Sequence, residues 1–360
     1  MREREGLVMG VVSVVLLVGV GSGSSTGAVF VFGDDLLDSG NNNYIPSMAK
    51  SNFPPYGLDF PQGPTGRFSN GKLPPDLLAE FVGLPYPPPY TDPATVGPKI
   101  LQGLNYASAA AGILDQTGQH YIARIPMNKQ IENFRESIGK MLAIVNQNTT
   151  TLSAHLAKSV FIIAIGSNDY MNNYLLPELY SSSAQFTPLA FSDMLVRQLA
   201  QQLMALFYMG ARKLVVSSVG PLGCTPSQVY SSGGAQCVER VNEMVVLFNS
   251  ALRTLLINLN SRLPSANFVF VDVFGIMSDI LINPYLYGFS VTLKSCCEVG
   301  EGKGQISCVP SSIPCANRNS YAFWDGFHPT EALYRVVAER SFFGPQSDAY
   351  PMNIQQLTLQ

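Results

Sequence analysis

The sequence predicts an α/β fold, a three-layer α/β/α sandwich around a central, mostly parallel, five-stranded sheet. Continuous apolar runs of strand length alternate with amphipathic helical patterns, which is typical of parallel strands covered on both faces. No internal repeat or low-complexity linker interrupts the alternation, and this favours one large domain. The runs expected as strands are residues 28–32, 104–107, 160–165, 214–219 and 268–273.

Helical patterns lie between these runs. Residues 73–82 are expected to form a short amphipathic helix and residues 194–209 a longer one. In residues 238–263, large apolar side chains recur at spacings of three and four and define one stripe. Packing on the sheet accounts for that stripe without any functional role. Pro329 is expected to begin the last helix, because proline is favoured in the first turn.

The chain is expected to have three parts. Residues 1–27 have the features of a secretory signal peptide: Arg2 and Arg4 precede an apolar run too short to span a bilayer, and small residues follow. An uncleaved anchor is the alternative. Residues 28–350 are the single folded domain, and residues 351–360 are a C-terminal tail. Inside the domain, residues 44–100 are rich in proline and aromatic residues and predict irregular loops.

Composition and charge exclude some classes of protein. Charged residues make up 13% of the 360 residues, the net charge is −3, and no basic cluster exceeds two residues. Since binding to a phosphate backbone needs clustered Lys and Arg, no nucleic-acid partner is expected. No stretch after the leader has the roughly 18 to 20 apolar residues of a membrane helix, so no stable membrane insertion is expected. The leader predicts a secreted protein, extracellular or in the cell wall, and oligomeric state has no sequence signal.

Secretion makes the six cysteines candidates for disulfides. Cys224 and Cys237 flank a Gly/Ser-rich loop and are expected to pair. Two further bridges are expected within the later cluster, and the sequence does not choose their pairing. The cluster consists of Cys296, Cys297, Cys308 and Cys315. A zinc site is the competing interpretation, but no histidine lies near these cysteines, so no metal is expected. Asn148 begins the one glycosylation sequon and is expected on a surface loop.

Polar residues follow the first three apolar runs. Gly33 ends the first run and is followed by Asp34 and Asp35, in the way that α/β enzymes present a reactive group above the carboxyl edge of a sheet. Tiny residues around Ala109 follow the second run and leave backbone N–H groups accessible, and Asn168 follows the third. An N–H group and an amide at one point have the composition of an oxyanion hole. Taken alone, an asparagine such as Asn168 is more often a turn-stabilising residue.

His328 is the histidine with a catalytic pattern. Asp325 lies three residues before it, at a spacing that lets the carboxylate fix the imidazole tautomer and raise its basicity. His120 and His155 have no such partner in the sequence and are expected to be structural or simply exposed. Asp325 and His328 are therefore the candidate orienting acid and general base.

Six ordered segments resemble the SGNH hydrolases, and in particular the plant-type GDSL esterase/lipase family. They are residues 30–43, 66–71, 103–108, 166–169, 220–224 and 323–331, and together they extend over nearly the whole mature chain. The resemblance implies a flavodoxin-like α/β/α fold, a Ser-His-Asp mechanism without a cofactor, and a small-molecule ester or acetylated glycan as substrate. It implies that His328 is the general base, that Asp325 orients it and that Asn168 is an oxyanion donor. Acyl length and the binding residues stay open.

Two positions depart from the family pattern. The family often has glycine where this chain has Ala109, a mild change because alanine keeps the N–H group. The nucleophilic serine of the family falls at position 35, where this chain has Asp35. A carboxylate there is a poor nucleophile toward esters, and at about 4 Å it repels a developing oxyanion by roughly 4 kcal/mol. That energy corresponds to about three decades in rate.

Three hypotheses follow for the function. The protein is a secreted ester hydrolase impaired or altered by Asp35, which would act as a nucleophile or as a general base for water. Alternatively, it is a non-catalytic protein that keeps the pocket to bind an acyl lipid or an acetylated glycan. A purely structural wall or storage protein is supported only by the disulfides and the glycosylation sequon. Replacement of the missing nucleophile by Ser39 is disfavoured, because the family pattern already contains that serine.

Overall fold

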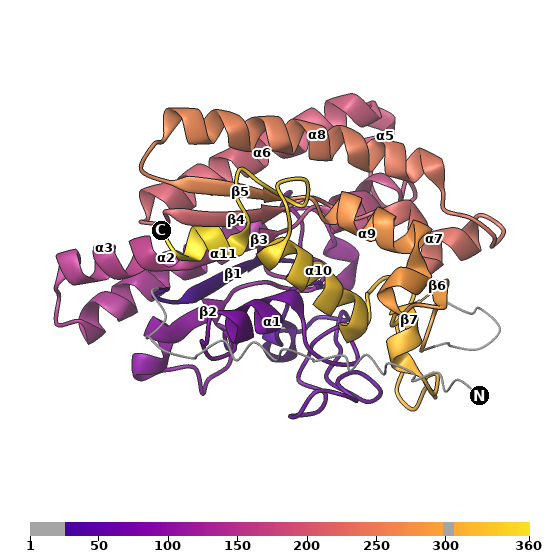
Figure 1. Ribbon diagram of the computed structural model, residues 1–360, viewed down its shortest axis with the longest axis horizontal. Coiled ribbons are helices and arrows are strands. Elements are labelled where there is room, and N and C mark those ends of the chain that lie inside the picture. Colours follow the sequence, from indigo (N-terminus) through magenta and orange to yellow (C-terminus); the bar gives the residue numbers. More distant parts are fainter. Residues whose placement is uncertain (1–25, 298–305) are drawn as a thin grey trace, which may run out of the picture.

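The computed structural model describes residues 26–297 and 306–360, and within them a central sheet has the strand order β2-β1-β3-β4-β5-β8 (Figure 1). The first five strands in the chain are parallel to one another. They are β1 (Val29–Gly33), β2 (Gly103–Asn105), β3 (Val160–Ala164), β4 (Lys213–Ser217) and β5 (Asn267–Val271). The prediction of a mostly parallel α/β sheet is confirmed, and each expected run contains the greater part of one of these strands.

A sixth strand extends the sheet beyond the prediction of five. Strand β8 (Ala349–Tyr350) pairs antiparallel with the edge strand β5 through Ala349–Val271 and Tyr350–Phe270. Two residues are too few to show the alternation by which strands are recognised in a sequence. The strand therefore exists because of its tertiary pairing, and the sheet is parallel except at this edge.

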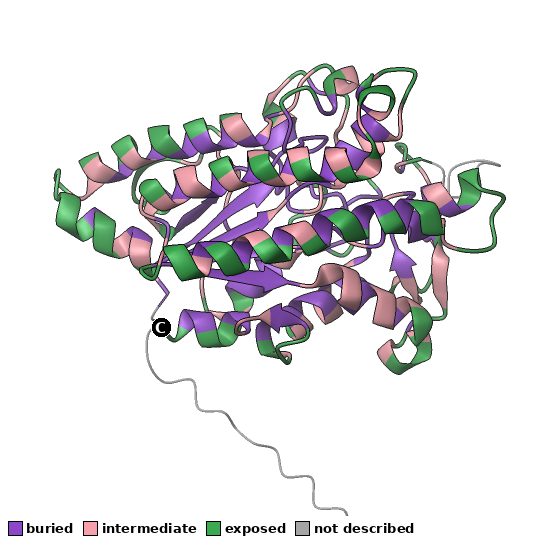
Figure 2. Ribbon diagram, turned by 90° about the horizontal axis from the view of Figure 1, so that it is seen from above, coloured by how far each residue is buried: buried purple, intermediate pink, exposed green. Residues whose placement is uncertain are grey.

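Helices cover both faces of the sheet, which gives the three expected layers. One face carries α2 (Met127–Ile144), α3 (Thr149–Lys158), α6 (Pro188–Tyr208) and α8 (Glu239–Arg262). The other carries α1 (Pro74–Phe81), α9 (Val273–Ile282), α10 (Glu331–Phe343) and α11 (Ile354–Thr358). Successive residues of β1 contact opposite layers: Phe30 and Phe32 pack on the first, and Val29 and Val31 on the second. The long helices turn buried residues inward and exposed residues outward (Figure 2).

The remaining elements are short and lie in the connections. Helices α4 (Ser167–Asp169), α5 (Ser182–Gln185) and α7 (Pro226–Ser231) follow strands β3 and β4. Strands β6 (Val291–Ser295) and β7 (Tyr321–Phe323) form a separate two-stranded parallel sheet. Residues 44–100 contain α1 and otherwise mostly turns and loops, as expected from their proline content.

Capping side chains set helix boundaries that the apolar pattern misplaced. Helix α6 begins six residues before the expected start, because the Thr187 hydroxyl accepts a hydrogen bond from the Ala190 N–H and caps it. Helix α10 begins at Glu331, where the Thr330 hydroxyl accepts from the Leu333 N–H. Pro329 thus precedes the helix instead of starting it. Helices α1 and α8 lie within one residue of their expected bounds.

The C-terminal residues expected to be a tail form helix α11 and pack on the domain. Ile354 and Leu357 are buried in the layer formed by α1, α9 and α10. The Lys213 side chain donates a hydrogen bond of 3.4 Å to the carbonyl of Thr358 and ties the helix to β4. The leader expected at residues 1–27 lies almost wholly outside the described residues. Within the described part of the chain, none of the helices has the length and apolar character needed to cross a membrane.

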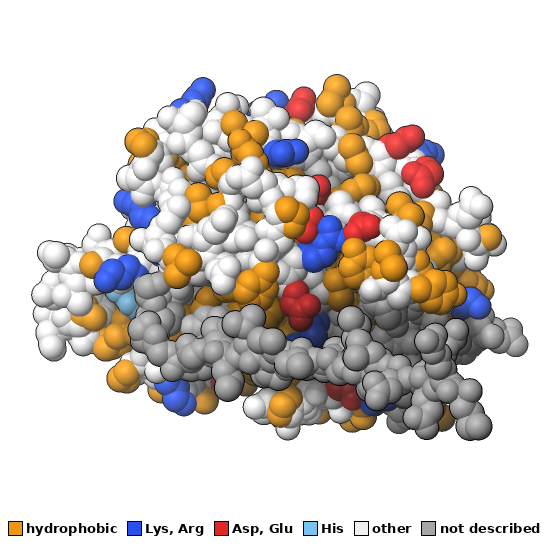
Figure 3. Space-filling model, in the orientation of Figure 1, with side chains coloured by type: hydrophobic (Ala, Val, Ile, Leu, Met, Phe, Trp, Pro, Cys, Tyr) orange, Lys and Arg blue, Asp and Glu red, His pale blue; other side chains and the backbone are white. Residues whose placement is uncertain are grey.

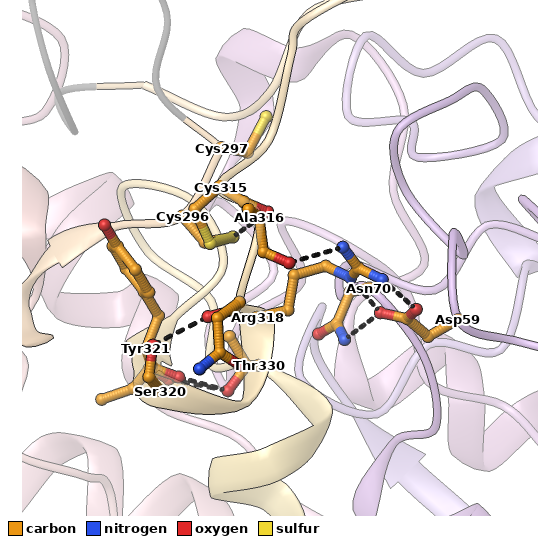
Figure 4. Close-up of a disulfide and its surroundings, with 12 residues drawn as sticks. Asp59, Asn70, Cys296, Cys297, Cys315, Ala316, Arg318, Ser320, Tyr321 and Thr330 are labelled. Carbon is orange, nitrogen blue, oxygen red and sulfur yellow. Dashed lines mark hydrogen bonds and ion pairs between the residues drawn. A yellow bond between two sulfur atoms is a disulfide. The ribbon is translucent and has the colours of Figure 1, made fainter. Parts of the chain in front are cut away.

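Disulfides connect all six cysteines, which agrees with the expected bridges and not with the alternative zinc site. Cys224 pairs with Cys237, and the later cluster, whose pairing was left open, joins Cys296 to Cys315 and Cys297 to Cys308. Figure 4 shows how this cluster is attached to the rest of the molecule: Arg318 forms an ion pair with Asp59, to which Asn70 also donates a hydrogen bond. The proline-rich loops and the cysteine cluster are therefore held together.

The glycosylation sequon lies at a helix start on the surface. Asn148 is exposed and caps α3, with its side chain accepting a hydrogen bond of 2.9 Å from the Thr151 N–H. The residue is accessible, although it is part of a helix cap and not of a free loop. Charged side chains are sparse on the face shown in Figure 3, where Lys and Arg are scattered without forming a continuous patch.

Candidate active site

The candidate catalytic residues meet at the carboxyl edge of the sheet. Asp35 follows β1 and Asn168 follows β3, which is paired directly with β1. Asp325 and His328 lie on the turn between β7 and α10, nearly three hundred residues after Asp35. Parallel strands place their carboxyl ends at one edge, so the two strand exits become neighbours, and the C-terminal turn is folded back onto them.

The turn after β1 is held by a close approach to β3 and by a glutamine of α2. A Cβ atom on Gly33 would lie 2.2 Å from the carbonyl oxygen of Ala164, so only glycine fits there. The buried Gln130 side chain accepts from the Gly33 N–H at 2.9 Å and donates to its carbonyl at 2.8 Å. These contacts fix the direction in which the chain leaves the strand, and with it the place of Asp35.

The Asp35 carboxylate lies between the imidazole and the amide donors. Its Oδ2 is 2.9 Å from Nε2 of His328. Its Oδ1 accepts from Nδ2 of Asn168 at 2.6 Å and from the Ala110 N–H at 3.3 Å. One carboxylate oxygen thus occupies the position facing the base, while the other takes up the N–H groups that would stabilise a substrate oxyanion.

Asp325 fixes the opposite side of the imidazole. Its two carboxylate oxygens each lie 2.8 Å from Nδ1 of His328. The carboxylate also accepts from the backbone N–H groups of Phe327 and His328, and from the Tyr56 hydroxyl at 2.6 Å. Phe68 covers the imidazole, with its ring centroid 4.9 Å from that of His328. The His328 ring is therefore oriented with Nδ1 toward Asp325 and Nε2 toward Asp35.

The backbone N–H groups of Ala109 and Ala110 donate to two different carboxylates. The N–H group of Ala109 donates to Oδ2 of Asp38 at 3.1 Å, and the Ala110 N–H donates to Asp35 instead. Ala110 has φ 64°, in the left-handed region that alanine rarely adopts. The N–H group that contacts Asp35 therefore belongs to Ala110, next to Ala109, the residue expected to donate to an oxyanion.

Electrostatics make His328 a cation at neutral pH. Burial by itself lowers the pKa of His328, but the charges and hydrogen bonds of Asp325 and Asp35 outweigh it and raise that pKa to about 10. For Asp35, burial raises the pKa, and the contacts with His328 and Asn168 more than offset this, so the net shift is downward. The site therefore consists of an imidazolium between two carboxylates.

Three other acidic or hydroxyl residues near the turn have structural roles. Asp38 accepts from the N–H groups of Gly40 and Asn41, and burial raises its pKa to about 6. Asp34 is fully buried, accepts from the Leu36 N–H, and has a pKa raised well above the ordinary value, chiefly by burial. The Ser39 hydroxyl donates to the carbonyl of Pro87 at 3.4 Å. None of these contacts leads to His328, so Ser39 does not take the place of a nucleophile beside it.

Some residues that support the site lie far from it in the chain and have no local signal in the sequence. Gln130 lies on α2 and Tyr56 in the proline-rich loops, and neither has a local pattern that indicates a hydrogen bond to Gly33 or Asp325. Asp169 is a further case: it accepts from the N–H groups of Ile113 and Leu114 and holds the segment after Ala110 in place. Only the Asn-Asp pair at the end of β3 could have drawn attention to it.

A cavity of about 510 Å³ opens beside the candidate catalytic residues. Its outer part is lined by Phe53 and Phe68 from the proline-rich loops and by Met171 and Asn172 after β3. The volume is within the range of small-molecule sites, which is roughly 300 to 1,000 Å³. Among the described residues, His, Cys, Asp and Glu side chains do not form a group of three or more that could hold a metal ion.

Comparison with known proteins identifies the family. The GDSL-like lipase/acylhydrolase family matches residues 29–341. The chain belongs to this family. One GDSL esterase/lipase of Arabidopsis thaliana is 48% identical over 335 residues, which are 92% of this chain and 89% of the relative. GDSL esterase/lipase 7 of the same plant is 46% identical over 350 residues, 95% of this chain and 96% of the relative.

Proposed function

We propose that this GDSL-family protein is a secreted esterase/lipase for carboxylic esters, in which Asp35 strongly impairs hydrolysis. The observation that carries the proposal is the position of the Asp35 carboxylate, with one oxygen on His328 and the other on Asn168 and Ala110. Its substrates by family are lipid acyl esters or acetylated cell-wall glycans. Asp325, His328, Asn168 and the Ala110 N–H group form the machinery that a nucleophile at position 35 would use.

Two physical effects oppose serine-type catalysis in this arrangement. The substrate carbonyl oxygen needs the N–H groups that already bind Oδ1 of Asp35, and its developing charge would lie beside a carboxylate. His328 is protonated at neutral pH and cannot accept a proton from an attacking hydroxyl or water. Residual turnover would use Asp35 as a general base for water or as the nucleophile. As the nucleophile, its oxygen would attack the ester carbonyl and expel the alkoxide, which would take a proton from His328. Water would then cleave the resulting mixed anhydride.

A second candidate function is binding of an acyl or acetylated ligand without turnover. The cavity next to the site supports it, because a change of nucleophile removes chemistry but leaves the walls of the cavity intact. Secretion is supported by the signal-peptide pattern, by three disulfides and by the exposed sequon at Asn148. The extracellular space or the cell wall is therefore the proposed location.

Esterase assays of the purified protein and its Asp35→Ser variant test the proposal. With p-nitrophenyl acetate and butyrate as substrates, Asp35→Ser is expected to exceed the native kcat by about three decades, since the opposing carboxylate is gone and His328 becomes a base. The native protein is expected not to react with a fluorophosphonate probe, and the Asp35→Ser variant is expected to be labelled.

The Asp35→Asn variant is the control that identifies the source of any native turnover. Native activity that disappears in Asp35→Asn would make Asp35 a nucleophile or base and would exclude the binding-only function. Serine-like turnover by the native protein that survives in Asp35→Asn would overturn the proposal. Saturable ligand binding by a native protein without turnover would favour the second candidate function.

A further inference from the structure

The cavity beside Asp35 continues from the polar site into the interior of the molecule. Ala164 and Ser217 line it at the carboxyl ends of β3 and β4. Ile162 and Val215 line it two residues earlier on the same strands, and their register partners them across the sheet. Two residues of strand correspond to about 6 to 7 Å. The cavity thus runs beneath the carboxyl edge, between the sheet and the layer that contains α10.

Helix α10 forms the long wall of this inner part. Tyr334, Val337, Ala338 and Ser341 line the cavity, and their spacings of three, one and three place them on one face of the helix. From Tyr334 to Ser341 the helix rises about 10 Å. The inner cavity is therefore elongated along α10, a shape that suits a linear chain better than a sugar ring.

The inner walls are almost entirely apolar. The residues that form them from the sheet and from the surrounding helices are Leu78, Ile162, Val215, Val271, Val337 and Ile354. The Ser341 hydroxyl donates to the carbonyl of Val337 at 2.6 Å and has no need of a ligand. A glycan would leave its hydroxyl groups without partners on these walls, whereas a hydrocarbon chain loses nothing by entering.

Tyr334 lies in the cavity wall with an unsatisfied hydroxyl group. It is 4% exposed, and among the described residues its hydroxyl has no hydrogen-bond partner. A buried hydroxyl without a partner is costly, and a ligand oxygen would satisfy it. Tyr334 is the first of the α10 residues that line the cavity, and α10 begins three residues after His328.

From this arrangement we infer that the site takes a linear acyl ester longer than acetyl, with its hydrocarbon chain lying between the sheet and α10. The ester group would lie at Asp35, His328 and Tyr334, and the chain would extend toward Ser341. This inference rests on the proposed function, because it names the substrate class of the same site. It favours lipid acyl esters over acetylated glycans.

Binding of methyl esters to the native protein, measured by calorimetry, tests the inference without turnover. Affinity is expected to rise roughly threefold to fourfold for each added methylene from methyl acetate to methyl octanoate. Equal affinity for methyl butyrate and methyl octanoate would overturn the inference, since the inner cavity would then be unused.

Matched substitutions at the two parts of the cavity show where the chain lies. Ala338→Met narrows the inner part of the cavity and is expected to weaken binding of methyl octanoate at least tenfold, with binding of methyl butyrate unchanged. Ala49→Met makes the same change at the outer wall and is expected to have little effect on the binding of either ester. Met277→Ala widens the inner cavity on the side of α9 and is expected to increase the affinity for methyl laurate relative to methyl butyrate. Met48→Ala is the matched control at the outer wall. If Ala338→Met does not fold, the Met277→Ala pair decides.

Assays in the Asp35→Ser background separate this inference from the proposed function. If Asp35→Ser is inactive while the native protein shows the chain-length series and the response to inner substitutions, the proposed function fails and the inference stands. If Asp35→Ser hydrolyses p-nitrophenyl acetate and octanoate with equal kcat/KM, and neither inner substitution alters binding, the inference fails and the proposed function stands.

Discussion

Two turns of the molecule each bring a carboxylate to His328, and the two carboxylates have different consequences. Asp325, on the C-terminal turn, is wholly buried and is held by two backbone N–H groups and the Tyr56 hydroxyl, so it orients the imidazole. Asp35, on the turn after β1, has a side chain 15% exposed and is held by Asn168 and the Ala110 N–H. The comparison shows that two carboxylates in contact with one imidazole differ in burial and in the donors that hold them.

The largest expected effect is on kcat, when Asp325 is replaced in a protein that already carries Asp35→Ser. In the Asp35→Ser background, Asp325→Asn is expected to lower kcat for p-nitrophenyl butyrate by about four decades, because the imidazole loses the partner that fixes its tautomer. Asp325→Asn in the native protein serves as the control for folding, by circular dichroism. A loss of less than tenfold would show that Asp325 does not orient the base.

The second prediction concerns the charge on His328. Asp35→Asn removes one of the two carboxylates that raise its pKa to about 10, and is expected to lower that pKa by about one to three units in an NMR titration of the imidazole. An unchanged pKa would mean that Asp325 alone holds the proton.

The same shift has a consequence for stability. A raised folded-state pKa stabilises the protein below the unfolded value of about 6.5, and this contribution is lost as the pH rises through about 10. The native Tm is therefore expected to fall between pH 7 and pH 10 more steeply than that of Asp35→Asn. The lowered pKa of Asp35 stabilises the folded protein above the unfolded-state pKa of the carboxyl. This contribution to stability is lost as the pH falls through the folded-state pKa.

The smallest expected effect tests the support of the turn after β1. Gln130→Leu removes the two hydrogen bonds between this side chain and the backbone N–H and carbonyl of Gly33. Because both backbone groups lose a buried partner, the unfolding free energy is expected to fall by about 2 kcal/mol. Urea unfolding measures it, with the partly buried Gln198→Leu as the control on α6. A loss equal to that of the control would show that close packing of Gly33 on β3 suffices to shape the turn.

The local pattern of the sequence was sufficient for the general architecture. Buried parallel strands are continuous apolar runs, and long helices carry a period that core packing imposes, so the five parallel strands and helices α1 and α8 were found near their observed positions. Strand β8 and helix α11 were not found, because two and five residues carry too little pattern and owe their structure to the edge of β5 and to the α10 layer.

The sequence by itself determined the fold class, the family resemblance and the identity of Asp35, Asn168, Asp325 and His328 as a group. Tertiary structure decided which oxygen of Asp35 contacts which donor and that the Ala110 N–H contacts this carboxylate. It also decided that Gln130 and Tyr56 support the two turns. The physical reason is that hydrogen-bond geometry and burial depend on groups far apart in the chain. Local sequence patterns depend on the structure of one segment and carry no information about contacts with distant segments.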